Sequence, residues 1–183
     1  MTKVLIKWFA LLIPSFIMSI VGRLLAPILP FFASEDGWLP DWLSWFQTPD
    51  NPLDGDRGHK KRWPKNGLFW TYIRRVAWLL RNVCYGFDET VCGIEMYKTD
   101  VTVHEGNPDI SDVKGISGKC FWRLFRGDKL IGFQWYFVQH YKIWRLKACV
   151  RINFGWKLWN PECYHKQYAI YFHPMKKMQW VKD

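Results

Sequence analysis

KVLIKWFALLIPSFIMSIVGRLLAPILPFF, residues Lys3 to Phe32, is a long apolar segment that only Lys7 and Arg23 interrupt. Its uninterrupted centre, Trp8 to Gly22, has fifteen residues. That is shorter than the roughly 20 residues that a membrane-crossing helix usually needs. An arginine near a helix end can extend to the lipid headgroups and so lengthen the usable segment. Residues 1–34 are therefore predicted to form a membrane-anchoring helix, with Arg23 at the membrane surface.

Two other interpretations of this segment compete with the anchor. A cleavable signal peptide needs small residues at a cleavage site soon after the apolar run, where Arg23 and Pro27 stand instead. A buried core helix conflicts with Pro14 inside the run and with the lack of a polar face. Hydropathy favours a transmembrane helix.

The charges and the cysteines predict different orientations for the anchor. Lys3 and Lys7 precede the apolar run and acids follow it, which places the N-terminus in the cytoplasm. A full crossing would then put the rest of the chain outside. The five cysteines form no CxxC pair and indicate a reducing compartment instead. A helix that enters and returns, or a second crossing, therefore stays open.

The composition predicts a packed, interface-seeking protein. The chain has 183 residues, an apolar fraction of 49% and an aromatic fraction of 19%, with 13 tryptophans. Tryptophan and tyrosine favour surfaces where one end of the ring is dry and the other wet, such as membrane interfaces and binding faces. The formal charge of +10 favours phosphate-bearing partners, either anionic lipid or nucleic acid. A lipid membrane is thus the first predicted partner.

Residues 35–66 are predicted to form a Trp-rich loop in which acids precede bases. Within WFQTPDNPLDGDRGHKKRWPK, the donors Asp50, Asp54 and Asp56 resemble part of a calcium loop. The match fails because Pro52 occupies the third position and Lys61 the twelfth, where a bidentate glutamate belongs. Turn-forming residues explain the composition without a metal. A looser cation site stays open, with the candidates Asp50, Asp54, Asp56 and His59.

Residues 67–87, GLFWTYIRRVAWLLRNVCYGF, are predicted to form an amphipathic interfacial helix that ends at a glycine. Its arginines gather along one side, whereas apolar residues cover most of the rest. The alternative is a helix that covers a β-sheet with its arginines in solvent. With Arg23 and the preceding tryptophans, this helix supplies the residues predicted to meet an anionic membrane surface: Arg23, Arg74, Arg75, Arg81, Trp38, Trp42, Trp70 and Trp78.

Residues 88–183 are predicted to form a small antiparallel β domain. KCFWRLFRGDKLIGFQWYFVQHY is a hairpin candidate with a two-residue turn at Gly127-Asp128. In WRLKACVRINF, apolar residues alternate with a second set that includes Arg145, Lys147 and Arg151, so one face is predicted to be basic. With nearby aromatics this face could stack on nucleic acid. No RNA-binding signature is present, so anionic lipid is the favoured partner.

The loop also carries a family resemblance. SWFQTPDNPLDGD, followed after a basic segment by RNVCYGF, resembles a family of small tailed-bacteriophage proteins of unknown function. The resemblance covers about residues 35–87 and the β domain more loosely. It implies a phage origin and action inside or at the envelope of an infected bacterium, and the apolar N-terminus places the predicted site of action at the inner membrane. The same segment is the predicted partner-binding surface, through Trp45, Phe46, Gln47, Asp50, Asn51, Asp54 and Asp56.

These features favour a membrane-associated phage accessory protein that binds a host envelope or defence protein, or another phage component. No GxSxG, HExxH, phosphate-loop or Rossmann motif occurs, so the sequence gives no positive support for an enzyme or a cofactor. One alternative is a cation-dependent hydrolase of a phosphate-bearing substrate, built on the aspartates of the loop and His59. The other is nucleic-acid binding through the basic strand, and a homo-oligomer stays open. The predicted fold class is α+β, with a membrane helix, an Arg-striped helix and a small antiparallel sheet.

Overall fold

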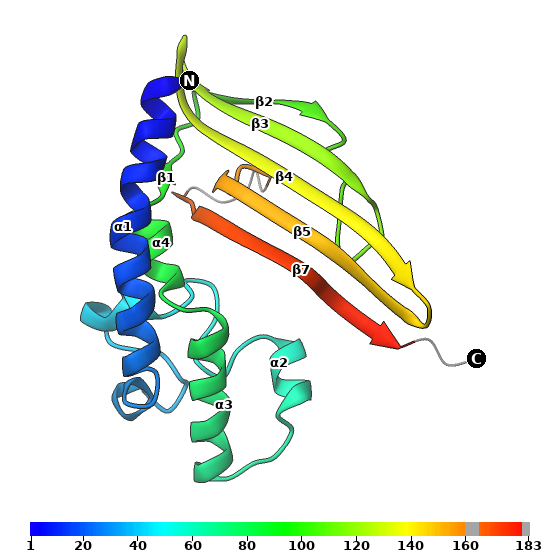
Figure 1. The fold of residues 1–183 in the computed structure, drawn as a ribbon. Helices are drawn as coiled ribbons and strands as arrows, with labels where there is room; N and C mark the ends of the chain where they lie inside the picture. Colours follow the sequence, from blue (N-terminus) through cyan, green and yellow to red (C-terminus); the bar gives the residue numbers. More distant parts are fainter. Residues whose placement is uncertain (160–164, 181–183) are drawn as a thin grey trace. The chain divides into compact units, whose positions relative to one another are not determined.

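The computed structural model describes residues 1–159 and 165–180, with side chains as far as Lys176. It is an α+β structure in which helices and 3₁₀ helices precede antiparallel strands (Figure 1). The helical elements are α1 (Thr2–Leu25), η1 (Leu29–Phe32), η2 (Asp41–Phe46), α2 (Arg57–Arg62), α3 (Leu68–Arg81) and α4 (Tyr85–Thr90). The strands are β1 (Ile94–Glu95), β2 (Asp100–Gly106), β3 (Gly118–Arg126), β4 (Lys129–Ile143), β5 (Leu146–Trp156), β6 (His165–Lys166) and β7 (Tyr168–Trp180).

The chain divides into two compact units, which we call the helical unit (residues 9–92) and the sheet unit (residues 1–8 and 93–183). The helical unit contains most of the three predicted segments 1–34, 35–66 and 67–87. Its core includes Leu29, Leu43, Leu53, Trp78 and Leu79, all at most 7% exposed. The loop between the predicted helices is therefore part of this core, because Leu53 is fully buried in it.

Helix α1 packs along one side within the helical unit. Ser15 Oγ donates a hydrogen bond to Asp88 Oδ1 at 2.7 Å, and Cys84 Sγ donates to the Met18 carbonyl at 2.9 Å. A Cβ atom at Gly22 would lie 2.4 Å from Cys84 Sγ. Glycine is thus needed where α1 meets the chain before α4.

The predicted helix over residues 67–87 is interrupted. α3 ends at Arg81, and Cys84 has a positive φ of 49° before α4 begins at Tyr85. Gly86 lies inside α4 and does not end a helix. A Cβ atom there would lie 2.4 Å from the Ser44 carbonyl oxygen, so glycine allows α4 to lie against η2.

The main sheet has five strands in the order β2-β3-β4-β5-β7, and all neighbours are antiparallel (Figure 1). The predicted turn at Gly127-Asp128 is confirmed, since Arg126 pairs with Lys129 and Gly127 has a φ of 55°. Two-residue hairpin turns favour glycine at such a position.

The two faces of the sheet differ in character. Trp135 stacks on Phe137 and Phe154 on one face, with ring centroids 6.2 and 5.9 Å apart. At one end of this face, Trp8 of the first helical turns contacts Phe133 and Phe154, each with ring centroids 6.0 Å apart. The other face buries polar groups, including a 2.9 Å hydrogen bond from Gln134 Nε2 to Asn153 Oδ1.

Candidate functional site

One exposed apolar surface of the helical unit lies on α1, on the side opposite its protein contacts. We call it the outer face of α1. Its side chains are between 44% and 71% exposed. They are Phe9, Ile13, Phe16, Ile17, Ile20 and Leu24.

The side of α1 that packs on protein carries small residues instead. Ser15 is 7% exposed, Ala26 is fully buried, and Gly22 is buried between them. Small residues facing protein and large apolar residues facing outward are typical of helices in lipid, where close backbone approach gives most of the packing energy. In a water-soluble protein the large apolar residues would be the buried ones.

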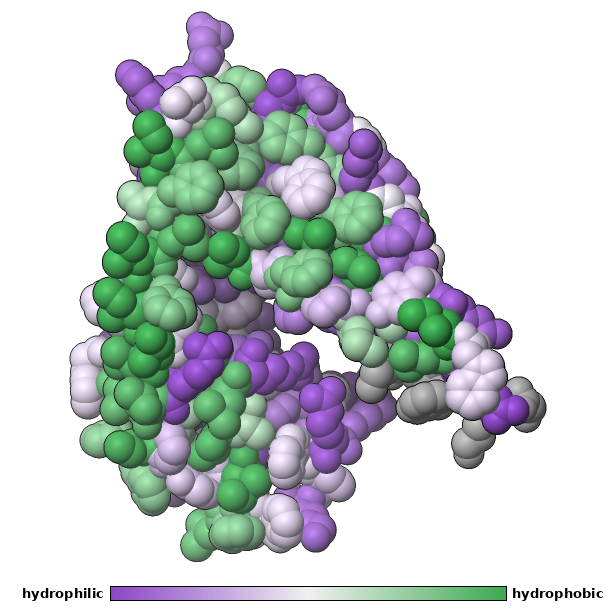
Figure 2. Space-filling model, in the orientation of Figure 1, coloured by the Kyte–Doolittle hydropathy of each residue, from purple (hydrophilic) through white to green (hydrophobic). Residues whose placement is uncertain are grey.

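Among the helices of residues 1–159 and 165–180, α1 is the one that is long and apolar enough to cross a membrane. Only 17% of its most apolar 18 residues are buried. A core helix would be mostly buried, and α1 is not. Figure 2 shows these hydrophobic residues in green along α1 at the left of the view.

Three exposed tryptophans lie close together in the sequence of the helical unit, and we call them the Trp edge. Trp38, Trp42 and Trp45 are 41%, 70% and 47% exposed. Trp42 and Trp45 belong to η2, where each contacts a phenylalanine ring: Phe32 at 5.9 Å and Phe87 at 5.5 Å between centroids. These contacts fix the rings while leaving their other sides open.

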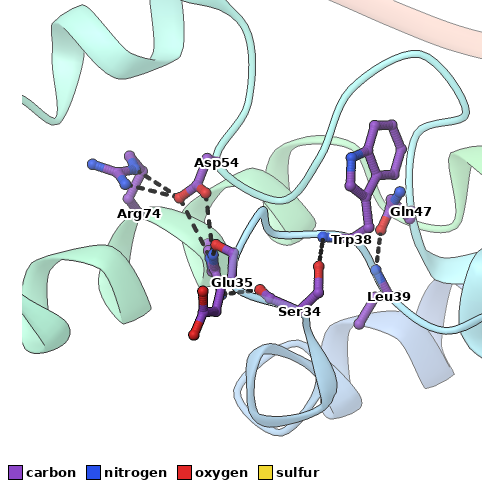
Figure 3. Close-up of polar contacts among 8 residues, drawn as sticks. Ser34, Glu35, Trp38, Leu39, Gln47, Asp54 and Arg74 are labelled. Carbon is purple, nitrogen blue, oxygen red and sulfur yellow. Dashed lines mark hydrogen bonds and ion pairs between the residues drawn. The ribbon is translucent and has the colours of Figure 1, made fainter.

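The predicted partner-binding residues do not all lie on this surface. Trp45 and Asp50 are exposed, and Phe46, Asn51 and Asp56 are partly exposed. Gln47 is only 6% exposed because its Oε1 accepts a 2.7 Å hydrogen bond from the Leu39 amide (Figure 3). The prediction that Gln47 contacts a partner is therefore wrong.

Asp54 is also internal, at the centre of an ion-pair cluster. Its Oδ1 lies 2.8 Å from Arg74 Nη2 (Figure 3). Its Oδ2 lies 3.2 Å from Arg75 Nη2. Arg75 Nη2 also donates to the Glu35 carbonyl at 2.9 Å. Burial alone raises the pKa of Asp54, but hydrogen bonds from Arg75 and Arg74 outweigh it and hold the pKa below the usual 3.8.

The predicted contact of Arg74, Arg75 and Trp78 with a membrane surface does not agree with their burial. The side chains of Arg74 and Arg75 are 15% and 11% exposed, and Trp78 is 4% exposed. Arg74 and Arg75 lie inside because Asp54 supplies their counter-charge from within the chain, and Trp78 Nε1 donates a hydrogen bond to Thr48 Oγ1 at 3.3 Å. Of the other predicted surface residues, Arg23, Arg81, Trp38 and Trp42 are exposed and Trp70 is partly buried.

The predicted cation candidates are separated by their contacts. Asp54 is bound by two arginines, and Asp56 Oδ1 accepts a hydrogen bond from the His59 amide as the N-cap of α2. Asp50 is exposed. Within residues 1–159 and 165–180, no group of three or more His, Cys, Asp or Glu side chains could hold a metal ion. Cys163, one of the five cysteines of the sequence, lies outside the described residues.

His59 is a buried histidine held neutral by its surroundings. It is 1% exposed, and its Nε2 lies 2.9 Å from the Arg74 carbonyl oxygen. Since a carbonyl only accepts, Nε2 carries the proton and Nδ1 is bare, and Nδ1 has no hydrogen-bond partner. Burial lowers the pKa of His59 below 6.5, although the Arg74 carbonyl raises it.

This burial predicts a loss of stability in mild acid. The unfolded chain takes up the proton first as the pH falls below about 6.5, while folded His59 stays neutral until lower pH. Stability is therefore present above that pH and is lost progressively below it. Urea unfolding at about pH 7.5 and about pH 5 measures the loss, and His59→Gln is expected to lose less. Because both proteins keep His173, whose pKa burial also lowers, an equal loss in both would contradict the assignment.

The predicted basic face of the sheet does not form. Arg145 lies in the turn before β5, since Ile143 pairs with Leu146 and Trp144 has a φ of 52°. Lys147 is exposed, but the Arg151 side chain is only 12% exposed. The strand begins two residues later than the sequence pattern predicts, and the face with Arg151 is covered.

Arg151 belongs to a polar network that the sequence did not predict. Its Nη1 lies 3.2 Å from Asp112 Oδ2, its Nη2 donates to the Tyr171 hydroxyl, and its guanidinium lies 5.4 Å from the Tyr136 ring centroid. Asp112 Oδ2 also lies 3.1 Å from Lys176 Nζ. Burial raises the pKa of Tyr136 to about 12, so this hydroxyl stays protonated. The network joins the loop before β3 to strands β4, β5 and β7.

Comparison with known proteins gives one match. A model of a family of unknown function (DUF7338) matches residues 1–180. No curated protein and no solved structure matches the chain significantly. Since the match extends over nearly all of the sequence, including α1 and the sheet, the chain belongs to the DUF7338 family of unknown function.

Proposed function

We propose that the protein is a membrane-associated accessory protein of a tailed bacteriophage. It is held at the inner membrane of the infected cell by α1. There it binds a host envelope or defence protein, or another phage component. The phage setting rests on the resemblance of the SWFQTPDNPLDGD and RNVCYGF segments described above.

The observation that carries membrane association is the outer face of α1. Its apolar side chains are at least 44% exposed, while the side against protein bears Ser15, Gly22 and Ala26. α3 repeats this arrangement, because Arg75 is buried while Phe69 is 65% exposed. Apolar side chains turned outward and charges paired within are favourable when the surrounding solvent is lipid.

The Trp edge is the proposed partner surface. Tryptophan is enriched among the residues that dominate binding energy at protein interfaces. Asp50, five residues after Trp45, is exposed and adds a charge close in sequence to this edge. Gln47 and Asp54 hold the loop in place, Gln47 by its hydrogen bond from the Leu39 amide and Asp54 by its ion pairs with Arg74 and Arg75.

Cell fractionation tests the membrane assignment. The tagged full-length chain is expressed in bacteria, and membranes are collected before and after an alkaline wash. We expect the chain to stay in the washed membrane pellet and to be released only by detergent, with an intact mass that includes residues 1–34. Recovery in the soluble fraction without detergent would refute the proposal, and a mass lacking the N-terminal segment would identify a cleaved signal peptide.

Partner binding predicts a large effect at Trp42. Truncating a central interface tryptophan typically costs at least about 2 kcal/mol, which is about 30-fold in affinity. Affinity capture from infected cells in mild detergent is therefore expected to lose its partner with Trp42→Ala. Trp144→Ala is the matched control, because Trp144 is 75% exposed in a turn of the sheet unit. Equal recovery of the partner by both variants would exclude the Trp edge.

Neither alternative function gains support from the geometry. The hydrolase needs the loop carboxylates together, yet Asp54 is paired with arginines and Asp56 caps α2. The nucleic-acid binder needs a continuous basic face, which Arg151 does not join. Calorimetric titration with magnesium, manganese and calcium, and a low-salt shift of labelled single-stranded nucleic acid, test the two directly.

A further inference from the structure

We propose that α1 lies in the plane of the membrane, with its outer face in the boundary between headgroups and acyl chains, and does not cross the bilayer. This inference rests on the proposed membrane association and specifies its geometry. It follows from four features of α1: the position of the outer face opposite the small residues, the protein contacts of those residues, the positions of the charges, and the length of the apolar run.

The outer face occupies one side of α1. At about 100° per residue, its six side chains centre about 150° from the stripe of Ser15, Gly22 and Ala26. Those three residues are buried within the helical unit. α1 has no polar face of its own, so in the membrane plane the protein contacts along Ser15 and Gly22 would take the place of that face. A lone crossing helix, in contrast, meets lipid all round.

The protein contacts reach the middle of the helix. Ser15, near the centre of α1, donates to the Asp88 carboxylate at 2.7 Å. Met18 and Gly22 follow with close contacts to Cys84. If α1 crossed the bilayer, α4 and the Asp88 carboxylate would lie at mid-depth, where a charged group is costly. With α1 in the membrane plane, the same contacts lie on the side away from the lipid.

Two of the three cations of α1 flank its outer face, whereas Lys7 lies about 130° from the centre of that face. Arg23 lies about 70° from the centre of that face, and Lys3 lies about 90° away on the opposite flank. Arg23 is exposed, and its Nη1 donates to the Ser19 carbonyl at 3.0 Å. The helix carries no acid. Cations on the flanks of an apolar face can extend to anionic headgroups, which identifies an anionic phospholipid surface as the occupant.

The uncharged part of α1 is shorter than the hydrocarbon layer, although the whole helix of 24 residues is long enough to cross it. Fifteen residues separate Lys7 from Arg23. At about 1.5 Å per residue they span about 23 Å, less than the roughly 30 Å of hydrocarbon. A helix lying in the plane has no such length requirement.

Reporter fusions at both ends of the full chain test this geometry. Alkaline phosphatase is active only outside the inner membrane, and green fluorescent protein fluoresces only inside it. We expect phosphatase fusions at either end to be inactive and both fluorescent fusions to be bright, in a chain that sediments with membranes. A chain whose residues 1–34 are replaced by a known single-crossing helix provides the positive control.

The outcomes separate the two proposals. An active C-terminal phosphatase with an inactive N-terminal one would overturn the in-plane geometry and leave membrane association intact. A soluble chain would overturn both, and dimerisation of that soluble chain through α1 would identify a second copy as the occupant.

Vesicle flotation tests the lipid headgroup chemistry separately. One lysine or arginine side chain near an anionic membrane surface raises the binding constant about fivefold. Arg23→Gln is therefore expected to weaken binding to vesicles of phosphatidylethanolamine and phosphatidylglycerol by about this factor, and to leave binding to phosphatidylcholine vesicles unchanged. An equal effect on both vesicles would exclude a contact between Arg23 and anionic headgroups.

Discussion

Replacing Ile13 and Ile20 with aspartate is expected to release the protein from membranes. Both residues lie on the outer face of α1 and are 67% and 44% exposed, so no buried protein contact is lost. Each isoleucine contributes about 2 kcal/mol when it enters an apolar phase. Losing both weakens the membrane partition by about 1,000-fold. Flotation of the double variant with vesicles measures this effect.

The control adds the same charge at polar surface positions. Asn66→Asp with Gln139→Asp changes two exposed residues and should float with the wild-type protein. Circular dichroism should show the same helix content for all three proteins. If the α1 variant floats as well as the control, lipid does not contact the outer face.

Replacing Asp54 with alanine is expected to cause the largest loss of folding stability among the loop residues. The change leaves Arg74 and Arg75 without their carboxylate, although their side chains are only 15% and 11% exposed. Removing one partner of a buried ion pair typically costs about 3–5 kcal/mol. Because the cluster keeps a little solvent contact, we expect about 3 kcal/mol of lost free energy of unfolding.

Asp50→Ala is the matched control for this substitution. Asp50 is exposed in the same loop, and surface substitutions usually change stability by less than about 0.5 kcal/mol. Urea unfolding of both variants gives the comparison. Similar stabilities would mean that Asp54 does not hold α3 to the loop, and would reopen a role for its carboxylate at the surface.

Local sequence signals predicted the parts of the fold that depend on local chemistry. Glycine at the first turn position predicted the hairpin at Gly127-Asp128, which the backbone confirms. The apolar run predicted a long N-terminal helix, and α1 extends from Thr2 to Leu25. In both cases the decisive residues are neighbours in the sequence.

Long-range contacts explain where prediction failed. The helical periodicity of residues 67–87 grouped the arginines correctly along one side of α3. Whether that side faces solvent or the core depends on Asp54, which lies 20 residues before Arg74. Arg151 was assigned to an open face because the alternation of β5 gives no sign that Asp112, 39 residues earlier, covers it. A charged stripe alone therefore does not distinguish a surface from an internal ion-pair cluster.

One signal was present and could have been used. Ser15, Ser19, Gly22 and Ala26 follow one another at spacings of four, three and four residues within an apolar helix. This spacing places small residues on one face, which is typical of close helix packing in membranes. It predicts the protein-facing side of α1, and Ser15 does contact Asp88 there.

Photocrosslinking from α1 in living cells determines whether lipid covers the outer face. A photoreactive residue is placed at Ile13 or Ile20 on the outer face, and at Ser19 near the protein-facing side. We predict phospholipid adducts from Ile13 and Ile20, and crosslinks within the protein from Ser19. Lipid adducts absent from Ile13 and Ile20, or equally abundant at all three positions, would contradict an outer face buried in the membrane.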